Sequence, residues 1–216
     1  MQNVTRQFGG CLRDPRVSFL GNVRLGSPAL SLPELRAHYN AVVLACGAEG
    51  DRRLRVPGGA APGVHPAREF VWWYNAHPAA AAAPFDLRRA RSVAVCGLGN
   101  VAVDCARVLL QPPARLAATD AAAHAVGALR GSGVREVHLV GRRGPAQAAF
   151  TPKELRELVG LEGVKVVVTP GDALAALGPA CAAELGASRV RRRAVEVLRQ
   201  AVEEGEGKGK GEGKHG

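Results

Sequence analysis

The 216-residue sequence lacks several features that would place it in a special class of protein. No run approaches the roughly 18 consecutive apolar residues of a membrane-spanning helix, so we expect a soluble protein, or one at most peripheral to a membrane. The five cysteines are odd in number and have no C-x-x-C spacing, which favours buried thiols in a reducing compartment over a disulfide framework or a zinc site. The six histidines form no ligand pattern, and we assign none of them a catalytic or metal-binding role.

Aromatic residues are also scarce, at 4% of the sequence, although a net charge of +10 is typical of some nucleic-acid-binding proteins. The basic excess is local, because five arginines within residues 189–199 accompany a single glutamate. Aromatic side chains do not alternate with these arginines, so base stacking has little to work with. We predict no nucleic-acid partner. An acidic protein partner or a solvated helix face explains the arginines better.

The most informative segment is residues 92–110, where an apolar, β-branched run enters a glycine turn and then a helical pattern. Gly97 permits a tight turn, Gly99 allows the backbone to approach a pyrophosphate, and Ala102 lets the helix pack against the sheet. The helix would present N–H groups and the positive end of its dipole to phosphates. We interpret the segment as half of a dinucleotide site; the alternative is an ordinary strand, turn and helix whose glycines serve packing.

A second predicted strand, residues 134–140, is followed by Gly141, Arg142 and Arg143. In a simple Rossmann unit an acidic ribose-binding residue lies about 20 residues past the first glycines. Here the strand comes later, because an alanine-rich helix, with Asp120 as its candidate cap, is expected to intervene and to end near Gly131. Guanidinium groups bind a 2′-phosphate in bidentate fashion, so the pair predicts NADP(H) rather than NAD(H). The alternative is two exposed arginines after a strand.

Three other patterns concern local structure. Ser31 and Glu34 have capping-box spacing and predict a short helix, followed by a buried strand over residues 40–46 that leaves through a turn at Gly47. The aromatic residues gathered in positions 70–75 favour a packing anchor over a direct ligand contact.

A further helix is expected after Phe150. Thr151 stands at its cap, Pro152 at its first position and Glu154 at the capping-box place. Glu154 is therefore open to two roles, as a cap or as a nucleotide contact.

Several motifs together closely resemble the mitochondrial adrenodoxin reductase family of ferredoxin–NADP reductases. The motifs are GLGNVAVD at 97–104, VGRRGP at 140–145 and AFTPKELRE at 149–157. Shorter matches are FLGNV at 19–23, YNAVVL at 39–44, GAE at 47–49, VPG at 56–58, PGV at 62–64 and WYN at 73–75. The resemblance covers most of residues 2–200.

The resemblance implies an α/β fold, with a Rossmann-like NADP-binding domain built on a parallel sheet and preceded by a partial FAD-binding α/β domain. The corresponding divisions are a partial FAD-binding domain at 1–57, an interdomain linker at 58–88, an NADP-binding domain at 89–200 and a disordered low-complexity tail at 201–216.

The resemblance also implies an enzyme, an NADPH:adrenodoxin oxidoreductase. Such a flavoprotein takes hydride from NADPH onto FAD and passes single electrons to a small acidic ferredoxin (adrenodoxin) that serves mitochondrial cytochromes P450. It implies a location in the mitochondrial matrix, with or without association with the inner membrane. The residues carried over for NADP are Leu98, Gly99, Asn100, Val101, Arg142, Arg143 and Glu154, and for the FAD adenine Leu25. Those carried over for ferredoxin docking are Arg156, Arg189, Arg191, Arg192 and Arg193.

The sequence departs from the family pattern in three places. It lacks the opening glycine fingerprint for FAD and the closing segment that completes the flavin pocket, and Trp72 replaces a glycine. We therefore expect an internal fragment that binds FAD weakly or not at all and still binds NADP(H). Residues 1–13 are basic, as in a transit peptide, but match interior family sequence and are interpreted as interior.

Three alternatives remain at this point. They are a non-catalytic NADP-binding remnant, a basic module that binds ferredoxin or nucleic acid, and a glutamate-synthase-like flavoprotein subunit. The last of these lacks the KELR context found at residues 153–156.

Overall fold

The computed structural model describes residues 2–48, 50–51, 54–80, 82–83, 85–168 and 177–211. Glu49, part of a motif cited above, lies outside the described residues, as do positions 212–216. The chain divides into two compact units, Met1–Gly50 and Asp51–Gly216. The second unit includes both the expected linker and the expected NADP-binding domain.

The first unit contains two helices, α1 (Gln2–Leu12) and α2 (Leu32–His38). The second unit begins with α3 (Ala67–Tyr74), the 3-10 turn η1 (Pro78–Ala80), β1 (Ser92–Cys96), α4 (Asn100–Leu110), α5 (Pro113–Ala117) and α6 (Ala123–Arg130). It continues with β2 (Glu136–Val140), the 3-10 turn η2 (Pro145–Gln147), α7 (Pro152–Val159), α8 (Pro179–Ala187) and α9 (Arg189–Gly211).

The centre of the second unit is a parallel pair of strands, β1 and β2, joined through α4, α5 and α6. The register pairs Ser92 with Glu136 and Cys96 with Val140, so both strands end at the same edge. Side chains alternate along each strand, with Val93, Val95 and Val137 facing the core. This arrangement confirms the α/β class and the parallel Rossmann-like unit predicted from the sequence.

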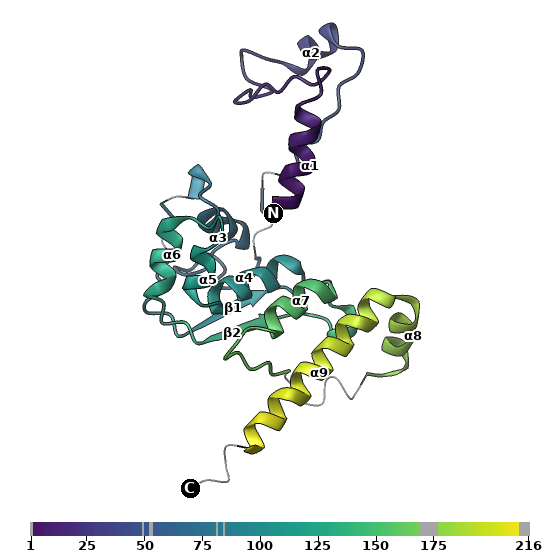
Figure 1. The fold of residues 1–216 in the computed structure, drawn as a ribbon. Helices are drawn as coiled ribbons and strands as arrows, with labels where there is room; N and C mark the ends of the chain where they lie inside the picture. The colour runs from purple at the N-terminus through teal and green to yellow at the C-terminus, as the bar shows by residue number, and fades with distance from the viewer. Residues whose placement is uncertain are drawn as a thin grey trace. The chain divides into compact units, whose positions relative to one another are not determined.

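Helix α4 separates two apolar clusters and contributes to both. One face of the helix, with Cys105, Val108 and Leu109, packs against residues of α3, α5 and α6. The other face, with Val103 and Ala106, packs against α7 and α9. In Figure 1, α4 lies beside the two strands, α7 lies beside α4, and α9 runs alongside α7, in agreement with the contacts among these elements. The helix that follows the glycine turn is thus held on two sides.

The aromatic residues of α3 form part of the first cluster. Phe70, Trp73 and Tyr74 are buried there, which confirms that these side chains serve packing. Trp72, where the family pattern has glycine, fits within the helix. Its ring stacks on His77 at 4.3 Å, and the Arg68 guanidinium lies 4.3 Å from its centroid.

The strand expected at residues 40–46 is wrong, because the structure forms no strand there. Val43 is 85% exposed and Leu44 61% exposed, and in the described part of the first unit no neighbouring strand pairs with this segment. A parallel strand needs a partner for its backbone N–H and C=O groups. The preceding capping box is confirmed, since Glu34 N–H donates to Ser31 Oγ at 3.3 Å and Ser31 N–H to Glu34 Oε2 at 2.6 Å.

Two other expectations differ at helix ends. Helix α6 ends before Gly131 as predicted, but Ala122, not Asp120, is its N-cap, and no side chain caps it. The N–H of Ala122 instead donates to the Tyr74 carbonyl at 2.9 Å, which fixes the helix start through a distant partner. Helix α9 runs on to Gly211, so the structure is helical over residues 201–211, where the sequence predicts disorder. Helix propagation adds one hydrogen bond per residue once the earlier turns have formed.

Candidate functional site

The glycine turn after β1 has the geometry of a phosphate-binding loop. Gly97 has φ +152°, a conformation that L side chains rarely adopt, and its N–H donates to the Val140 carbonyl at 2.8 Å. Gly99 is the N-cap of α4, and no side chain caps the helix there. A Cβ at Gly99 would meet no atom within 4 Å, so the space beside the helix N-terminus is open. The positive end of the α4 dipole therefore faces a place where an anion can approach.

Arg142 and Arg143 follow β2 at the same edge of the sheet. Because Cys96 pairs with Val140, the glycine turn and the two arginines begin side by side. Both arginines are exposed, and neither forms an ion pair or hydrogen bond with the part of the chain that the structure describes. Two guanidinium groups are thus available to a phosphate next to the turn. A pair of guanidinium groups in this position can bind a phosphate group in bidentate fashion.

Leu98 lies at the tip of the glycine turn, and its side chain covers the start of the arginine segment. A Cβ at Gly141 would overlap the Leu98 side chain, so only glycine fits beneath it without displacement. The side chain of Leu98 is consequently committed to packing, and its backbone is the part that faces the turn.

The segment after the arginines returns to the glycine turn before α7 begins. The N–H of Ala149 donates to the Leu98 carbonyl at 2.7 Å, and Gly99 and Ala149 form a parallel bridge. Two residues later, Thr151 N–H donates to Asn100 Oδ1 at 2.7 Å. The segment from β2 to α7 is therefore attached to the glycine turn at both of its ends.

The hydrogen bonds at the N-terminus of α7 test one of the two roles predicted for Glu154, that of a helix cap. Thr151 is the N-cap as predicted, and its Oγ1 accepts from Glu154 N–H at 3.4 Å. The Glu154 carboxylate does not complete a capping box, because Asn100 takes the Thr151 N–H that Glu154 would accept. Its carboxylate makes no hydrogen bond or ion pair within the described ranges, so the role as a reciprocal cap is wrong and the nucleotide role stays a prediction.

The structure places all seven residues predicted for NADP at or beside one sheet edge. They are Leu98, Gly99, Asn100, Val101, Arg142, Arg143 and Glu154. Leu25 belongs to the first unit, where it is 39% exposed beside a turn in which Gly26 N–H donates to the Leu30 carbonyl.

The arginines predicted for partner docking are on α7 and α9, which pack against each other. Arg156, Arg189, Arg192 and Arg193 are exposed. Arg191 is less available, because its Nη1 donates to Glu184 Oε2 of α8 at 2.8 Å. The surface is therefore basic, but one of its predicted members is already paired.

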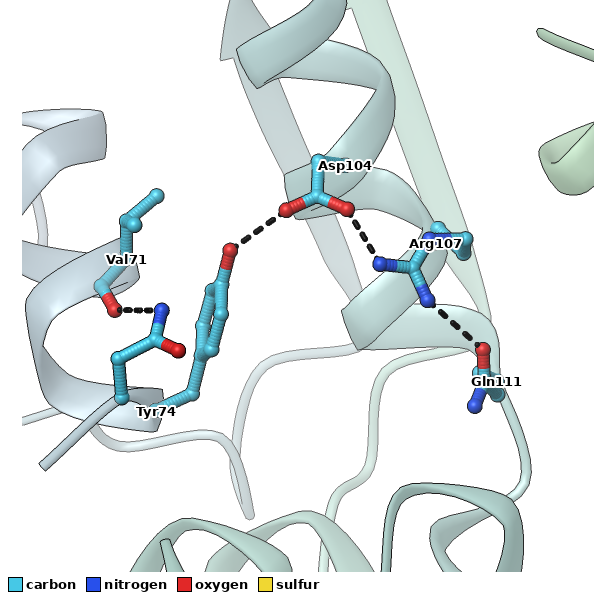
Figure 2. Close-up of polar contacts among 6 residues, drawn as sticks. Val71, Tyr74, Asp104, Arg107 and Gln111 are labelled. Carbon is cyan, nitrogen blue, oxygen red and sulfur yellow. Dashed lines mark hydrogen bonds and ion pairs between the residues drawn. The ribbon is translucent and has the colours of Figure 1, made fainter. Parts of the chain in front are cut away.

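A polar network that sequence reasoning missed connects α3 to α4 (Figure 2). The Tyr74 hydroxyl donates to Asp104 Oδ2 at 2.6 Å, and Arg107 binds the other oxygen of that carboxylate. Arg107 also donates to Gln111 Oε1 at 3.1 Å. Burial, and then the hydrogen bond to Asp104, raise the pKa of Tyr74 far above its usual range. Burial likewise raises the pKa of Cys105, to about 11.

The network does not reach the glycine turn through any of these hydrogen bonds, and we assign it to docking α3 on α4. Tyr74 and Asp104 are 30 positions apart, so no periodic signal in the sequence links them.

Among the described residues no helix is long and apolar enough to cross a membrane. The same residues contain no cluster of three or more acidic, histidine or cysteine side chains that could hold a metal ion.

Comparisons with known proteins relate this chain to two groups of reductases. No protein-family model matches the chain. The mitochondrial NADPH:adrenodoxin oxidoreductase of Arabidopsis thaliana is 48% identical over 195 residues, covering 90% of this chain and 40% of the relative. NADPH-ferredoxin reductase FprA of Mycobacterium tuberculosis is 47% identical over 199 residues, covering 92% of this chain and 42% of FprA.

The structure of Mycobacterium tuberculosis FprA in complex with NADPH matches with a TM-score of 0.84 and 46% identity, over 93% of this chain and 43% of that one. The chain thus spans about 40% of the length of the relatives that it matches.

Proposed function

We propose that this chain, a homologue of the NADPH:adrenodoxin and NADPH-ferredoxin reductases, carries the NADP(H) site of such an oxidoreductase. The observation that carries the proposal is the pair of exposed arginines beside the glycine turn, Arg142 and Arg143, which have no hydrogen-bond or ion-pair partner among the described residues. A 2′-phosphate is the group that distinguishes NADP(H) from NAD(H), and paired guanidinium groups are well suited to it. The similarity to an FprA structure in complex with NADPH supports the same ligand.

Each part of the site has its own role in this proposal. The turn at Gly97 and Gly99, with the start of α4 at Asn100 and Val101, faces the pyrophosphate. Arg142 and Arg143 bind the 2′-phosphate, and Glu154, at the first turn of α7, borders the nucleotide. When bound, NADPH supplies the hydride for the reaction. The residues of this chain bind and orient the nucleotide; none of them is assigned a proton or hydride.

We also propose that the reductase to which this sequence corresponds uses FAD, with Leu25 near its adenine. The described residues of the first unit do not form a flavin cradle by themselves, because residues 40–46 form no strand and Val43 is 85% exposed. No catalytic step is therefore derived through FAD for this chain. We propose electron transfer from NADPH to a ferredoxin for the whole reductase, and for the residues described here the proposed part in it is nucleotide binding.

An acidic ferredoxin is the proposed protein partner. Arg156, Arg189, Arg192 and Arg193 are exposed cations on two helices that pack together. Complementary charge of this kind accelerates encounter and fixes orientation, and it weakens as salt increases. Because Arg191 already pairs with Glu184, we expect it to contribute less than the other four.

We also propose a mitochondrial location for the reductase. The plant and mammalian relatives carry mitochondrial names, as in the human protein that is 47% identical over 174 residues. The mycobacterial relatives are bacterial proteins, so the similarity is shared across both settings.

Calorimetric titration of the 216-residue chain tests the proposed site. We expect NADP⁺ to bind about 100-fold more tightly than NAD⁺, because two charge-assisted contacts at an exposed site add about 2–3 kcal/mol. Free adenosine 2′-phosphate should compete with NADP⁺. Equal affinity for the two dinucleotides would contradict selection by the arginines, and no binding of either would contradict the site itself.

A further inference from the structure

The segment that carries the two arginines is held by the glycine turn at both ends. At its start, Gly97 N–H donates to the Val140 carbonyl and the Leu98 side chain covers Gly141. At its end, Ala149 N–H donates to the Leu98 carbonyl. Every one of these attachments uses backbone atoms or apolar packing.

Among the described residues, Asn100 adds a further attachment between the segment and the glycine turn, and it does so with its side chain. Its Oδ1 accepts the N–H of Thr151 at 2.7 Å across 51 positions of sequence. In α2 the equivalent cap N–H, that of Ser31, is accepted by Glu34 of the same helix. In α7 the local glutamate is bypassed, and a residue of the glycine turn accepts the cap N–H instead.

We infer that Asn100 is a positioning residue for NADP(H). By accepting the Thr151 N–H, its amide oxygen fixes the arginine segment relative to the pyrophosphate turn. The inference rests on the proposed function and assigns the Asn100 side chain a role different from direct contact with the nucleotide. Its backbone remains at the start of α4, facing the turn.

The consequence of this role depends on how many phosphate positions a ligand occupies. NADP⁺ engages the pyrophosphate turn and the arginines at once, so its affinity depends on the distance between them being preset. NAD⁺ engages only the turn, and adenosine 2′-phosphate lacks the pyrophosphate. Loosening the attachment therefore weakens NADP⁺ selectively, whereas loss of a direct contact to the pyrophosphate weakens NAD⁺ and NADP⁺ alike.

The first test is Asn100→Ala in the full chain, with calorimetric or competition titrations of NADP⁺, NAD⁺ and adenosine 2′-phosphate. Loss of the preset distance predicts about fivefold weaker NADP⁺ binding, close to the free energy of the one hydrogen bond that maintains it, with less than about twofold change for the other two ligands. Equal losses for NADP⁺ and NAD⁺ would overturn the inference in favour of direct contact. Unchanged NADP⁺ affinity would overturn it as well.

A second test changes the donor and leaves Asn100 in place. Thr151 has φ −84° and ψ 152°, which proline can adopt, so Thr151→Pro removes the N–H with little backbone strain. Thr151→Ala is the matched control, because it removes the Oγ1 cap but keeps the N–H. We expect Thr151→Pro to lower the preference for NADP⁺ over NAD⁺ about fivefold relative to Thr151→Ala.

The double variant tests whether the two substitutions remove the same hydrogen bond. Adding Asn100→Ala to Thr151→Pro should leave NADP⁺ affinity unchanged within about twofold, because both changes remove the same bond. Additive losses would overturn the inference. Should Thr151→Pro fail to fold, as judged by circular dichroism, the three-ligand comparison for Asn100→Ala decides alone. If the wild-type chain itself showed no preference for NADP⁺ over NAD⁺, the proposed function would be wrong, and that result differs from every outcome named for the variants.

Discussion

The contact between Tyr74 and Asp104 predicts how firmly α3 is docked on α4. Tyr74→Phe keeps the buried ring, which is 7% exposed, and removes only the hydroxyl that donates to Asp104 at 2.6 Å. A hydrogen bond to a charged acceptor contributes about 1.5–3 kcal/mol. The Asp104 side chain is 37% exposed and keeps Arg107, so water can replace the hydroxyl and the lower end applies. We expect a loss of about 1.5 kcal/mol, or roughly 3–6 °C in Tm for a unit of this size.

Urea and thermal unfolding of the wild type and Tyr74→Phe measure this loss at pH 7. Asp104→Ala should cost more, because it leaves the Tyr74 hydroxyl and Arg107 without that carboxylate. In the double-mutant cycle the two positions should couple by about 1 kcal/mol or more. A Tyr74→Phe variant within about 0.3 kcal/mol of wild type, with no coupling, would refute the reasoning.

The Tyr74 hydroxyl also makes the difference in stability between wild type and Tyr74→Phe depend on pH. Burial and Asp104 raise the folded-state pKa of Tyr74 above its ordinary value of 10.0, so its stabilisation is present below pH 10 and is lost as the pH rises further. The wild type should therefore lose stability above pH 10 more steeply than Tyr74→Phe. Parallel curves for the two proteins would mean that the hydroxyl is not protected in the folded state.

Three further outcomes are expected, two from individual residues and one from the first unit. Burial raises the pKa of Cys105 from 9.0 to about 11, so the free energy of unfolding that the neutral thiol contributes below pH 9 is lost above it. Between pH 8.5 and 10, urea unfolding should show the wild type losing about 1 kcal/mol more than Cys105→Ala. An equal loss for the two proteins would contradict this. Ala76 has φ +59°, and Ala76→Gly should raise the free energy of unfolding by about 0.5–1 kcal/mol, whereas destabilisation would show no strain there. Desalting the purified chain after incubation with FAD should leave no stoichiometric flavin absorbance; bound flavin at one equivalent would show that the first unit forms a cradle.

The sequence predicted correctly those features that depend on neighbouring residues. The turn at Gly97, the Ser31 cap and the Thr151 cap are local, because the groups that define them are within a few positions of one another. Periodicity likewise placed α4 and the two strands, since their apolar positions face one core.

The errors arise where a distant partner decides the outcome. Residues 40–46 have the composition of a strand but no strand beside them in the described part of the chain. The start of α6 is set by the Tyr74 carbonyl and not by Asp120. The cap N–H of α7 goes to Asn100, 51 positions away, and not to Glu154. Hydrogen bonds across such distances leave no spacing in a single sequence from which they can be predicted.

The most direct test of the central claim is the nucleotide preference of an Arg142→Ala, Arg143→Ala double variant. Its control is Arg89→Ala, Arg130→Ala, which removes the same charge from two exposed arginines outside the site. Titration with NADP⁺ and NAD⁺ should show NADP⁺ affinity falling about 100-fold in the first variant, NAD⁺ affinity changing less than about threefold, and the control keeping the wild-type preference. Equal losses for both dinucleotides, or an unchanged preference for NADP⁺, would contradict the assignment of these arginines to the 2′-phosphate.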